Sequence, residues 1–377
     1  MNLLLVGDAR TALTDPALTG VAKLAYLDPP YNTGKRFTQY NDTAPLARWL
    51  GMLEDVFTGV HGALAEDGSI WVHVDDTYVH RVRVLLDDVF GPANYVNTVV
   101  WEKKNRASFL NAHIASVTDQ ILVYAKDRTR LAPFVHTATA VGKRIPVHNK
   151  ANKPSQLSFP AGCMSFNFPD TTVPAGPMNT ATITSALLDD VVIENGVNVN
   201  AFRMTGPFRY GQEAIEKMAA SPGAFVCPRP MMRPSYLSQE ARGKVLTNLQ
   251  SFRVNGSPTN EDARAESEAL FGHGTDFDTP KPEGLLERII GAATAPGDTV
   301  LDAFAGSGTT AAVAQKMGRS WIAVEQSPET AARFIGPRID GILAGSDPLP
   351  LPGYTASAEG YEVIETADEL PGAESAA

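Results

Sequence analysis

The segment with the clearest chemical potential follows a short apolar run and consists of Asp28, Pro29, Pro30 and Tyr31. Two successive prolines enforce an extended backbone and remove its N–H donors, so the segment presents carbonyl oxygens, one carboxylate and one aromatic ring. This set suits an amino group attached to a flat ring. The carboxylate and a carbonyl can accept its two N–H bonds while Tyr31 stacks on the ring. The alternative is a rigid turn that buries a tyrosine.

A second segment combines an apolar strand-like run, a glycine-rich turn and the start of a helix. Glycines in the turn let the backbone approach a ligand closely, and the first N–H groups of the helix can bind it. The next strand-like run ends at Glu325, which could accept hydrogen bonds from a ribose or simply be a solvated helix cap. The match to a dinucleotide fingerprint is weak evidence when taken alone. The candidate residues are Asp302, Phe304, Gly306, Gly308, Thr309 and Glu325.

Both segments need a scaffold that brings strand ends together, and the chain predicts one. Apolar runs indicate strands, and apolar residues at helical spacing indicate helices. Alternation of the two is typical of a parallel sheet covered by helices on both faces, with ligands at the carboxyl ends of the strands. We expect strands at 3–6, 23–27, 69–74, 97–101, 120–124, 299–302 and 321–325, and helices at 46–64, 79–90, 283–293 and 309–316.

Between residues 132 and 276 this regularity fades, because prolines divide the stretch into short pieces. We expect a loop-rich module with a few strands and one helix near 212–220. After Arg338 no Lys or Arg remains, and residues 345–377 are rich in Pro, Gly, Ala, Ser and Glu. That composition predicts a disordered acidic tail.

The net charge of −10 is unevenly distributed. Residues 1–100 carry 7 Lys/Arg and 12 Asp/Glu, residues 101–260 carry 18 and 10, and residues 261–377 carry 7 and 20. The middle of the chain is therefore a basic block between acidic flanks. Such asymmetry favours a module that binds a polyanion, although each cation by itself is more often a solvated surface charge.

Together the motifs resemble a known family. Asp-Pro-Pro-Tyr at 28–31 with Phe-x-Gly-x-Gly at 304–308 is the motif pair of the amino-group DNA methyltransferases, and its order resembles the circularly permuted β group. The longer string at 26–34, Tyr-Leu-Asp-Pro-Pro-Tyr-Asn-Thr-Gly, resembles the adenine-specific modification subunits of type III restriction systems and their short phage relatives. The resemblance covers about 1–130 and 275–340, and residues 4–8, 67–76, 121–126 and 277–282 agree with it.

The resemblance implies an α/β fold, namely a doubly wound, mostly parallel Rossmann-like methyltransferase sheet with an inserted loop-rich target-recognition module. We expect residues 1–130 to form the catalytic half of the methyltransferase domain and 276–343 its cofactor-binding half. Residues 131–275 would be the inserted module, and 344–377 the disordered acidic tail.

The resemblance also implies a cofactor, S-adenosylmethionine, and a target, the N6 amino group of adenine in duplex DNA. The glycine turn would hold the methionine end of the cofactor, with Lys281 near its carboxylate, while Glu325 would bind the ribose and Asp8 would face the adenine. Asp28 to Tyr31 would hold the target base. The implied cofactor-binding residues are Asp8, Lys281, Asp302, Phe304, Gly306, Gly308, Thr309 and Glu325.

The residue chemistry supports these roles. The lone pair of the amino nitrogen is delocalised into the ring, and bonds to Asp28 and the Pro29 carbonyl would turn it toward the methyl donor. Direct in-line transfer follows, with Asp28 stabilising the positive charge that develops. The base must first flip out of the duplex at a cost of a few kcal/mol, and stacking on Tyr31 returns about 1–3 kcal/mol.

The basic block supplies candidate contacts to DNA phosphates and base edges. These are Lys103, Lys104, Arg106, Lys143, Arg144, Lys150, Arg203, Arg209, Tyr210, Arg229 and Arg233.

Composition narrows the remaining possibilities. Two cysteines, Cys163 and Cys227, cannot form a zinc cluster, and we expect no metal. The apolar start is too short for a signal peptide or membrane span, so we expect a cytoplasmic protein without a membrane partner. The expected partner is double-stranded DNA, and the chain length favours a solitary or phage enzyme over one with a restriction subunit. A homodimer is a further expectation.

Four alternatives stay open. Within the methyltransferases the alternative target is the N4 amino group of cytosine. It ranks second because enzymes that act on cytosine more often carry Ser where this chain has Asp28. A catalytically inactive DNA-binding regulator would carry a degraded catalytic motif. A nicotinamide-dependent oxidoreductase would leave Asp28 to Tyr31 unexplained. The motif pair alone does not exclude an RNA or protein substrate.

Overall fold

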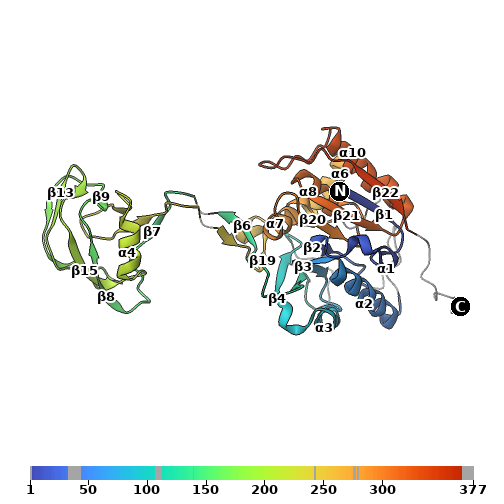
Figure 1. The fold of residues 1–377 in the computed structure, drawn as a ribbon, viewed down its shortest axis with the longest axis horizontal. Coiled ribbons are helices and arrows are strands. Elements are labelled where there is room, and N and C mark those ends of the chain that lie inside the picture. The colour runs from blue at the N-terminus through green and yellow to red at the C-terminus, as the bar shows by residue number, and fades with distance from the viewer. Residues whose placement is uncertain are drawn as a thin grey trace. The chain divides into compact units, whose positions relative to one another are not determined.

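The computed structural model describes residues 2–32, 44–106, 113–138, 140–241, 243–274, 277 and 280–366. The chain divides into two compact units (Figure 1). Unit 1 comprises Met1–His136 and Val245–Ala377, and unit 2 comprises Thr137–Lys244. The expected insertion of residues 131–275 is thus larger than unit 2. Its last 31 residues, from Val245 onward, belong to unit 1.

A sheet built from nine strands in the described part of the chain forms the centre of unit 1. β5 runs antiparallel to both of its neighbours and all other adjacent strands are parallel, which confirms the mostly parallel sheet. Across the sheet the strands are β19 (Leu249–Gln250), β4 (Tyr95–Glu102), β5 (Thr118–Ala125), β3 (Leu64–Val74), β2 (Ala22–Leu27), β20 (Thr299–Asp302), β21 (Ser320–Glu325), β1 (Asn2–Val6) and β22 (Tyr361–Glu365).

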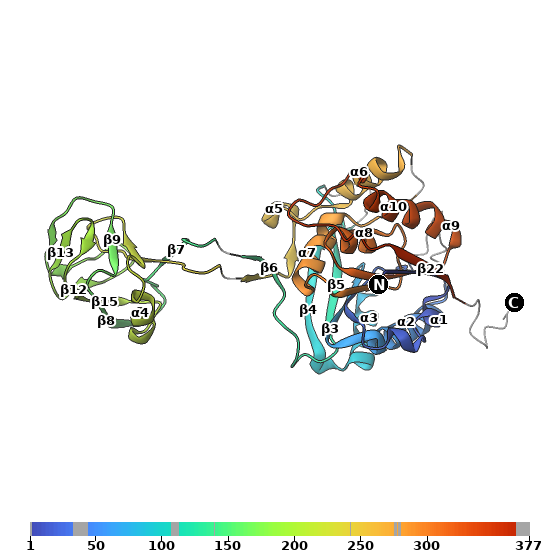
Figure 2. The ribbon, with the colours of Figure 1, turned by 45° about the horizontal axis from the view of Figure 1, so that its top comes forward.

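Helices cover both faces of this sheet, as Figure 2 shows. One face carries α1 (Ala9–Ala12), α2 (Leu46–Ala63) and α3 (Val79–Phe90), and the other carries α7 (Glu283–Ala293), α8 (Thr309–Lys316) and α10 (Gly336–Leu343). Helical spacing explains the packing of α2, since Trp49, Leu53 and Val60 lie on one face and are buried. Successive residues of β3 enter opposite cores: Ile70 and Val72 pack with α2, and Trp71 packs with α7.

Unit 1 contains six further helical elements among the residues that the structure describes. They are η1 (Pro16–Leu18), η2 (Pro92–Asn94), α5 (Phe252–Asn255), α6 (Asn260–Phe271), α9 (Pro328–Thr330) and η3 (Ala331–Ile335). β6 (Val135–Ala138) and β18 (Gly243–Val245) pair in a separate two-stranded sheet at the boundary between the units. Among the residues that the structure describes, no helix combines the length and apolar character needed to cross a membrane.

The C-terminal segment corrects one expectation. Residues 361–365 are not disordered: they form β22, which pairs in parallel with β1, so the first and last strands lie side by side (Figure 1). The buried Gln315 side chain fastens the approach to this strand by donating to the carbonyls of Ser357 (2.7 Å) and Glu359 (3.0 Å). Residues 367–377, the rest of the expected tail, lie outside the described residues.

Unit 2 contains more strand than the sequence predicts. Its core is rich in aromatic side chains, among them Phe159, Phe202 and Phe225, and the expected helix is α4 (Gln212–Ala219). One sheet has the order β10 (Thr172–Val173), β13 (Val191–Glu194), β14 (Val197–Asn198), β9 (Met164–Phe166), β16 (Phe225–Cys227), β17 (Ser235–Leu237) and β7 (Arg144–Pro146). The other has the order β11 (Gly176–Pro177), β12 (Ala186–Leu187), β15 (Phe202–Pro207) and β8 (Pro154–Phe159).

Candidate active site

The topology of unit 1 gathers four acidic residues at one edge of the sheet. β2, β20, β21 and β1 are parallel neighbours, so their carboxyl ends meet. Asp28, Asp302, Glu325 and Asp8 lie at or directly after those ends. A cleft of about 1250 Å³ runs along this edge. Predicted residues that line it are Asp8, Asp28, Pro29, Pro30, Tyr31, Lys281, Asp302, Phe304, Gly306, Thr309 and Glu325, whereas Gly308 packs behind it against Ile335.

Asp28 is held from both sides at the end of β2. The Tyr31 hydroxyl donates to its Oδ1 at 2.7 Å, and the ammonium of Lys281 pairs with its Oδ2. Burial, together with the charge of Asp28, raises the pKa of Tyr31 well above its ordinary value, so the hydroxyl keeps its proton and donates. The Trp49 indole donates to the Pro30 carbonyl at 2.7 Å and fixes the turn from the side of α2. Lys281 therefore contacts the Asp28–Tyr31 segment as well as lining the cleft.

A buried polar chain, absent from the sequence prediction as a functional group, supports Tyr31. The ring of Tyr31 stacks on His73 with centroids 6.4 Å apart and an interplanar angle of 22°. His73 Nδ1 is 2.7 Å from the Tyr26 hydroxyl, and its Nε2 is 3.5 Å from Asp119 Oδ2. Lys103 completes the chain by donating to Asp119 Oδ1 at 2.6 Å.

Burial and polar contacts together set the charges of His73 and Asp119. Burial, with a further contribution from the Lys281 charge, lowers the pKa of His73, so its ring is neutral near pH 7. Burial alone would raise the pKa of Asp119, but its contacts with His73 and Lys103 lower the pKa to about 2. A histidine within the apolar run of β3 is the sequence signal that could have identified this chain. Its acidic neighbour comes from β5 through strand pairing, which the sequence does not reveal.

The glycine turn has a backbone conformation that favours glycine. Gly306 and Gly308 have φ angles of 52° and 74°, in the left-handed region. A Cβ on Gly306 would lie 3.1 Å from the Phe277 ring, so a side chain there would also be crowded. Glu325 clamps the turn by accepting the N–H of Gly306 and that of Ser327, each at 2.9 Å. Burial raises the pKa of Glu325.

The remaining two acidic residues have different environments. Asp302 is buried and accepts the Phe304 N–H at 2.9 Å, and its burial raises its pKa to about 7. Asp8 caps the N-terminus of α1 and pairs with Arg10 at 2.6 Å. The hydrogen bonds from Arg10 lower the pKa of Asp8. One end of the cleft therefore carries an ionised carboxylate at Asp8, whereas Asp302 is only partly ionised near pH 7.

The predicted DNA-contacting cations fall into different settings. Lys103 and Lys104 line the cleft of unit 1, with Lys103 paired to Asp119, and Arg106 is exposed. Of the predicted contacts in unit 2, the exposed cations are Lys143, Arg144, Lys150, Arg203, Arg209 and Arg229.

Three predicted contacts in unit 2 interact with other residues of that unit. Arg233 turns inward, donating to Ser185 Oγ at 2.6 Å and to the Met178 carbonyl at 2.5 Å, so it is a structural residue of unit 2. Arg203 pairs with Asp189 at 2.8 Å, which offsets its charge. Tyr210 packs against the core.

We searched the described residues for side chains that could bind a metal ion. No group of three or more His, Cys, Asp or Glu side chains there could hold a metal ion. Cys163 and Cys227 are both buried, and burial raises the pKa of each thiol to about 11.

The chain is similar to several known proteins. The chain is 28% identical to the probable type III restriction-modification enzyme HindVI Mod subunit of Haemophilus influenzae, over 86% of this chain and 48% of that protein. It is 25% identical to the type II methyltransferase M.EcaI of Enterobacter cloacae, over 81% of this chain and 62% of that protein. The chain thus spans about half to three fifths of the length of these relatives.

Among solved structures, the PvuII DNA methyltransferase (cytosine-N4-specific) is 16% identical, with a TM-score of 0.47, over 90% of this chain and 86% of that one. The model of a DNA methylase family matches residues 22–335, which include both motifs and all of unit 2. Because that match takes in most of the sequence, the chain belongs to the DNA methylase family.

Proposed function

We propose that this chain transfers a methyl group from S-adenosylmethionine to the N6 amino group of adenine in duplex DNA. One observation carries the proposal: the Asp28–Tyr31 segment and the glycine turn held by Glu325 open into the same cleft at one edge of the sheet. In this proposal the site for the methyl donor lies next to the site for the amino group that accepts the methyl. Membership of the DNA methylase family supports the same reaction class.

The turn fits the methionine and ribose parts of S-adenosylmethionine. Left-handed glycines permit close backbone approach, and a Cβ at Gly306 would be crowded against Phe277. Each oxygen of Glu325 accepts one backbone N–H and retains a second lone pair for a ribose hydroxyl. When bound, the cofactor supplies an electrophilic methyl group. The residues that would hold it are Asp8, Asp302, Phe304, Gly306, Thr309 and Glu325.

The base site can orient and polarise an amino group. Asp28 already accepts from Tyr31 and Lys281, and each carboxylate oxygen has a further lone pair for an N–H of the base. With the Pro29 carbonyl accepting the second N–H, the nitrogen lone pair points out of the ring plane. Asp28 stabilises the positive charge that develops on the nitrogen and is placed to accept the released proton. Tyr31, backed by His73, supplies the stacking surface.

The proposed partners follow from the same reasoning. Double-stranded DNA is the substrate, and unit 2 is the proposed recognition module. The Haemophilus influenzae relative is named as the Mod subunit of a type III enzyme, so a restriction subunit is one proposed partner. Action without such a subunit is the alternative proposal. We retain the cytoplasm as the proposed location.

The test is single-turnover methylation of duplex DNA with labelled cofactor, followed by identification of the methylated base. Asp28→Ala should lower the rate by about a hundredfold or more, by analogy with the loss of one preorganised electrostatic contact. Cofactor and DNA binding should persist. Asp67→Ala is the matched control, because Asp67 pairs with Lys23 on the surface and does not line the cleft.

Two results would contradict the proposal in different ways. A parent-like rate for Asp28→Ala would overturn the mechanism. Methylated N4-cytosine as the product of the parent chain would keep the mechanism and replace adenine as the target.

A further inference from the structure

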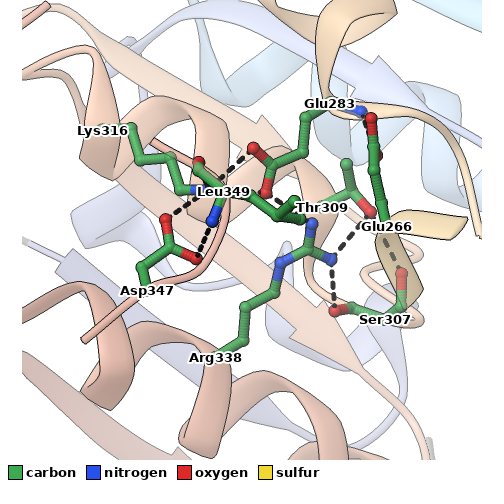
Figure 3. Close-up of polar contacts among 8 residues, drawn as sticks. All are labelled: Glu266, Glu283, Ser307, Thr309, Lys316, Arg338, Asp347 and Leu349. Carbon is green, nitrogen blue, oxygen red and sulfur yellow. Dashed lines mark hydrogen bonds and ion pairs between the residues drawn. The ribbon is translucent and has the colours of Figure 1, made fainter. Parts of the chain in front are cut away.

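A group of buried charges lies directly beneath the glycine turn (Figure 3). We call Glu283, Lys316, Arg338 and Asp347 the buried charge network. The side chains of Glu283, Lys316 and Arg338 are 2–4% exposed, and that of Asp347 is 10% exposed. Removing four charges from water costs several kcal/mol for each ion unless the pairing is good. Such a network needs an explanation beyond packing.

Arg338 connects this network to the glycine turn. Its Nη1 donates to the Ser307 carbonyl at 3.1 Å and to the Thr309 hydroxyl at 3.0 Å. Its Nη2 donates to Glu283 Oε1 at 2.8 Å. Figure 3 shows the guanidinium between these two sets of partners. Nη1 faces the glycine turn and Nη2 faces Glu283. Because the guanidinium is planar and rigid, it couples the position of Glu283 to that of the turn.

Glu283 is a rigid anchor because its own partners fix it. It is the first residue of α7, and Lys316 at the end of α8 donates to both of its oxygens at 2.7 Å. Its backbone N–H donates to Glu266 at 2.8 Å. Lys316 in turn pairs with Asp347 at 2.7 Å and donates to the Leu349 carbonyl at 2.6 Å.

The glycine turn is thus gripped from two sides. Glu325 accepts the Gly306 N–H at 2.9 Å, and Arg338 holds the carbonyl of the next residue, Ser307. Ser307 and Thr309 both line the cleft, whereas Arg338 itself does not. We propose that Arg338 is a positioning residue for the cofactor site, which sets the shape of the turn that S-adenosylmethionine contacts. This inference rests on the proposed function.

If Arg338 only stabilised the fold, its substitution would lower the melting temperature without a specific effect on cofactor affinity. The test therefore measures affinity and stability separately. Arg338→Lys keeps the charge opposite Glu283, but a single ammonium nitrogen cannot replace both nitrogens. We expect its affinity for S-adenosylmethionine, measured by calorimetry, to fall about tenfold or more, as for loss of a hydrogen bond to a charged group. The rate at saturating cofactor should change much less. Arg338→Gln should weaken affinity further.

Two control variants test whether destabilisation alone has this effect. Arg319→Lys alters another buried arginine, which holds the carbonyls of Thr294 (3.0 Å) and Met317 (2.5 Å) and makes no contact with the turn. Tyr124→Phe removes the hydrogen bond that the Tyr124 hydroxyl donates to Asp87 at 2.6 Å, in the core on the opposite face of the sheet. Both should lower the melting temperature, as Arg338→Lys does, yet keep the parent affinity.

Affinity within twofold of the parent in Arg338→Lys, or equal losses in the two controls, would overturn the inference. If Arg338→Lys does not fold, Glu283→Gln replaces it, because it keeps an oxygen for Arg338 and removes the anchoring charge. That variant should lose at least about threefold in affinity, and parent-like binding would again overturn the inference. A parent chain that binds no S-adenosylmethionine would instead refute the proposed function itself.

Discussion

Asp302, at the end of β20, carries a buried carboxyl group in the same cleft as Asp28 and Glu325. Burial raises its pKa to about 7, and the charges of Asp28 and Glu325 act in the same direction. Hydrogen bonds from Thr310 and from the Phe304 N–H oppose this rise. The folded chain therefore retains a proton here that an unfolded chain releases near the ordinary value of 3.8.

This raised pKa predicts a pH-dependent stability with a definite sign. Because the folded state binds the proton more tightly, the contribution is complete below about pH 4 and is lost as pH rises to about 7. Asp302→Asn keeps an oxygen for the Phe304 N–H and cannot ionise. Relative to the parent, its free energy of unfolding should therefore increase as the pH rises from about 4 to about 7 and then level off, each pKa unit corresponding to about 1.4 kcal/mol.

Urea unfolding at a series of pH values measures this difference. Asp88→Asn, on the exposed surface of α3, is the control and should show no such trend. A difference between Asp302→Asn and the parent that stays constant from pH 5 to pH 8 would contradict the shifted pKa.

Residues in the two motifs could be found from sequence because their chemistry is local. Asp28 and Tyr31 are three residues apart and bond to each other directly. His73 and Asp119 could not be found in this way, because they meet only through the antiparallel pairing of β3 with β5. Arg338 could not be found either, because its contact with Ser307 joins residues that are 31 positions apart in the chain.

At the scale of elements, prediction succeeded where the pattern and the ends are both local. The expected helices at 283–293 and 309–316 and the strand at 299–302 have the observed bounds of α7, α8 and β20. β22 was missed because it is an edge strand whose last four residues are exposed. Its backbone pairs with β1 while its side chains carry no burial pattern, so composition indicated disorder instead.

The attachment of this C-terminal segment depends on Gln315. This side chain is fully buried, accepts from Asn2 (3.0 Å) and from the Trp321 indole (2.7 Å), and donates to the carbonyls of Ser357 and Glu359. Gln315→Leu removes all of these bonds and leaves buried donors without this acceptor. We expect a loss of at least about 2 kcal/mol in the free energy of unfolding.

The same variant should release β22 specifically. Hydrogen exchange of the amides of Tyr361–Glu365 should accelerate well beyond that of β20 in the same protein. Gln239→Leu, at an exposed glutamine of unit 2, should leave both unchanged. Unaltered protection of β22 in Gln315→Leu would show that pairing with β1 alone holds the segment.

At the scale of the whole molecule, the cations of unit 2 are not equivalent. Lys143 and Arg144 are exposed, next to and within the short strand β7, and Arg209 donates to the carbonyl of Pro146 at the end of that strand. Arg203 and Lys217 are instead offset by Asp189 and Glu213, at 2.8 Å in each pair. If unit 2 binds DNA, we expect the cations around β7 to contact phosphates and the paired cations to contribute little.

Charge reversal separates these two groups. Lys143→Glu with Arg144→Glu should weaken DNA binding and reduce the slope of log affinity against log salt by about 2, because each lost phosphate contact removes about 0.9. Arg203→Glu with Lys217→Glu changes the formal charge equally and should alter the slope much less. Affinity for S-adenosylmethionine should stay at the parent value in both, since these residues lie in unit 2 and the cleft is built from unit 1. Equal slopes for the two double variants would mean that DNA senses only the net charge of unit 2, and the surface around β7 would then have no specific role.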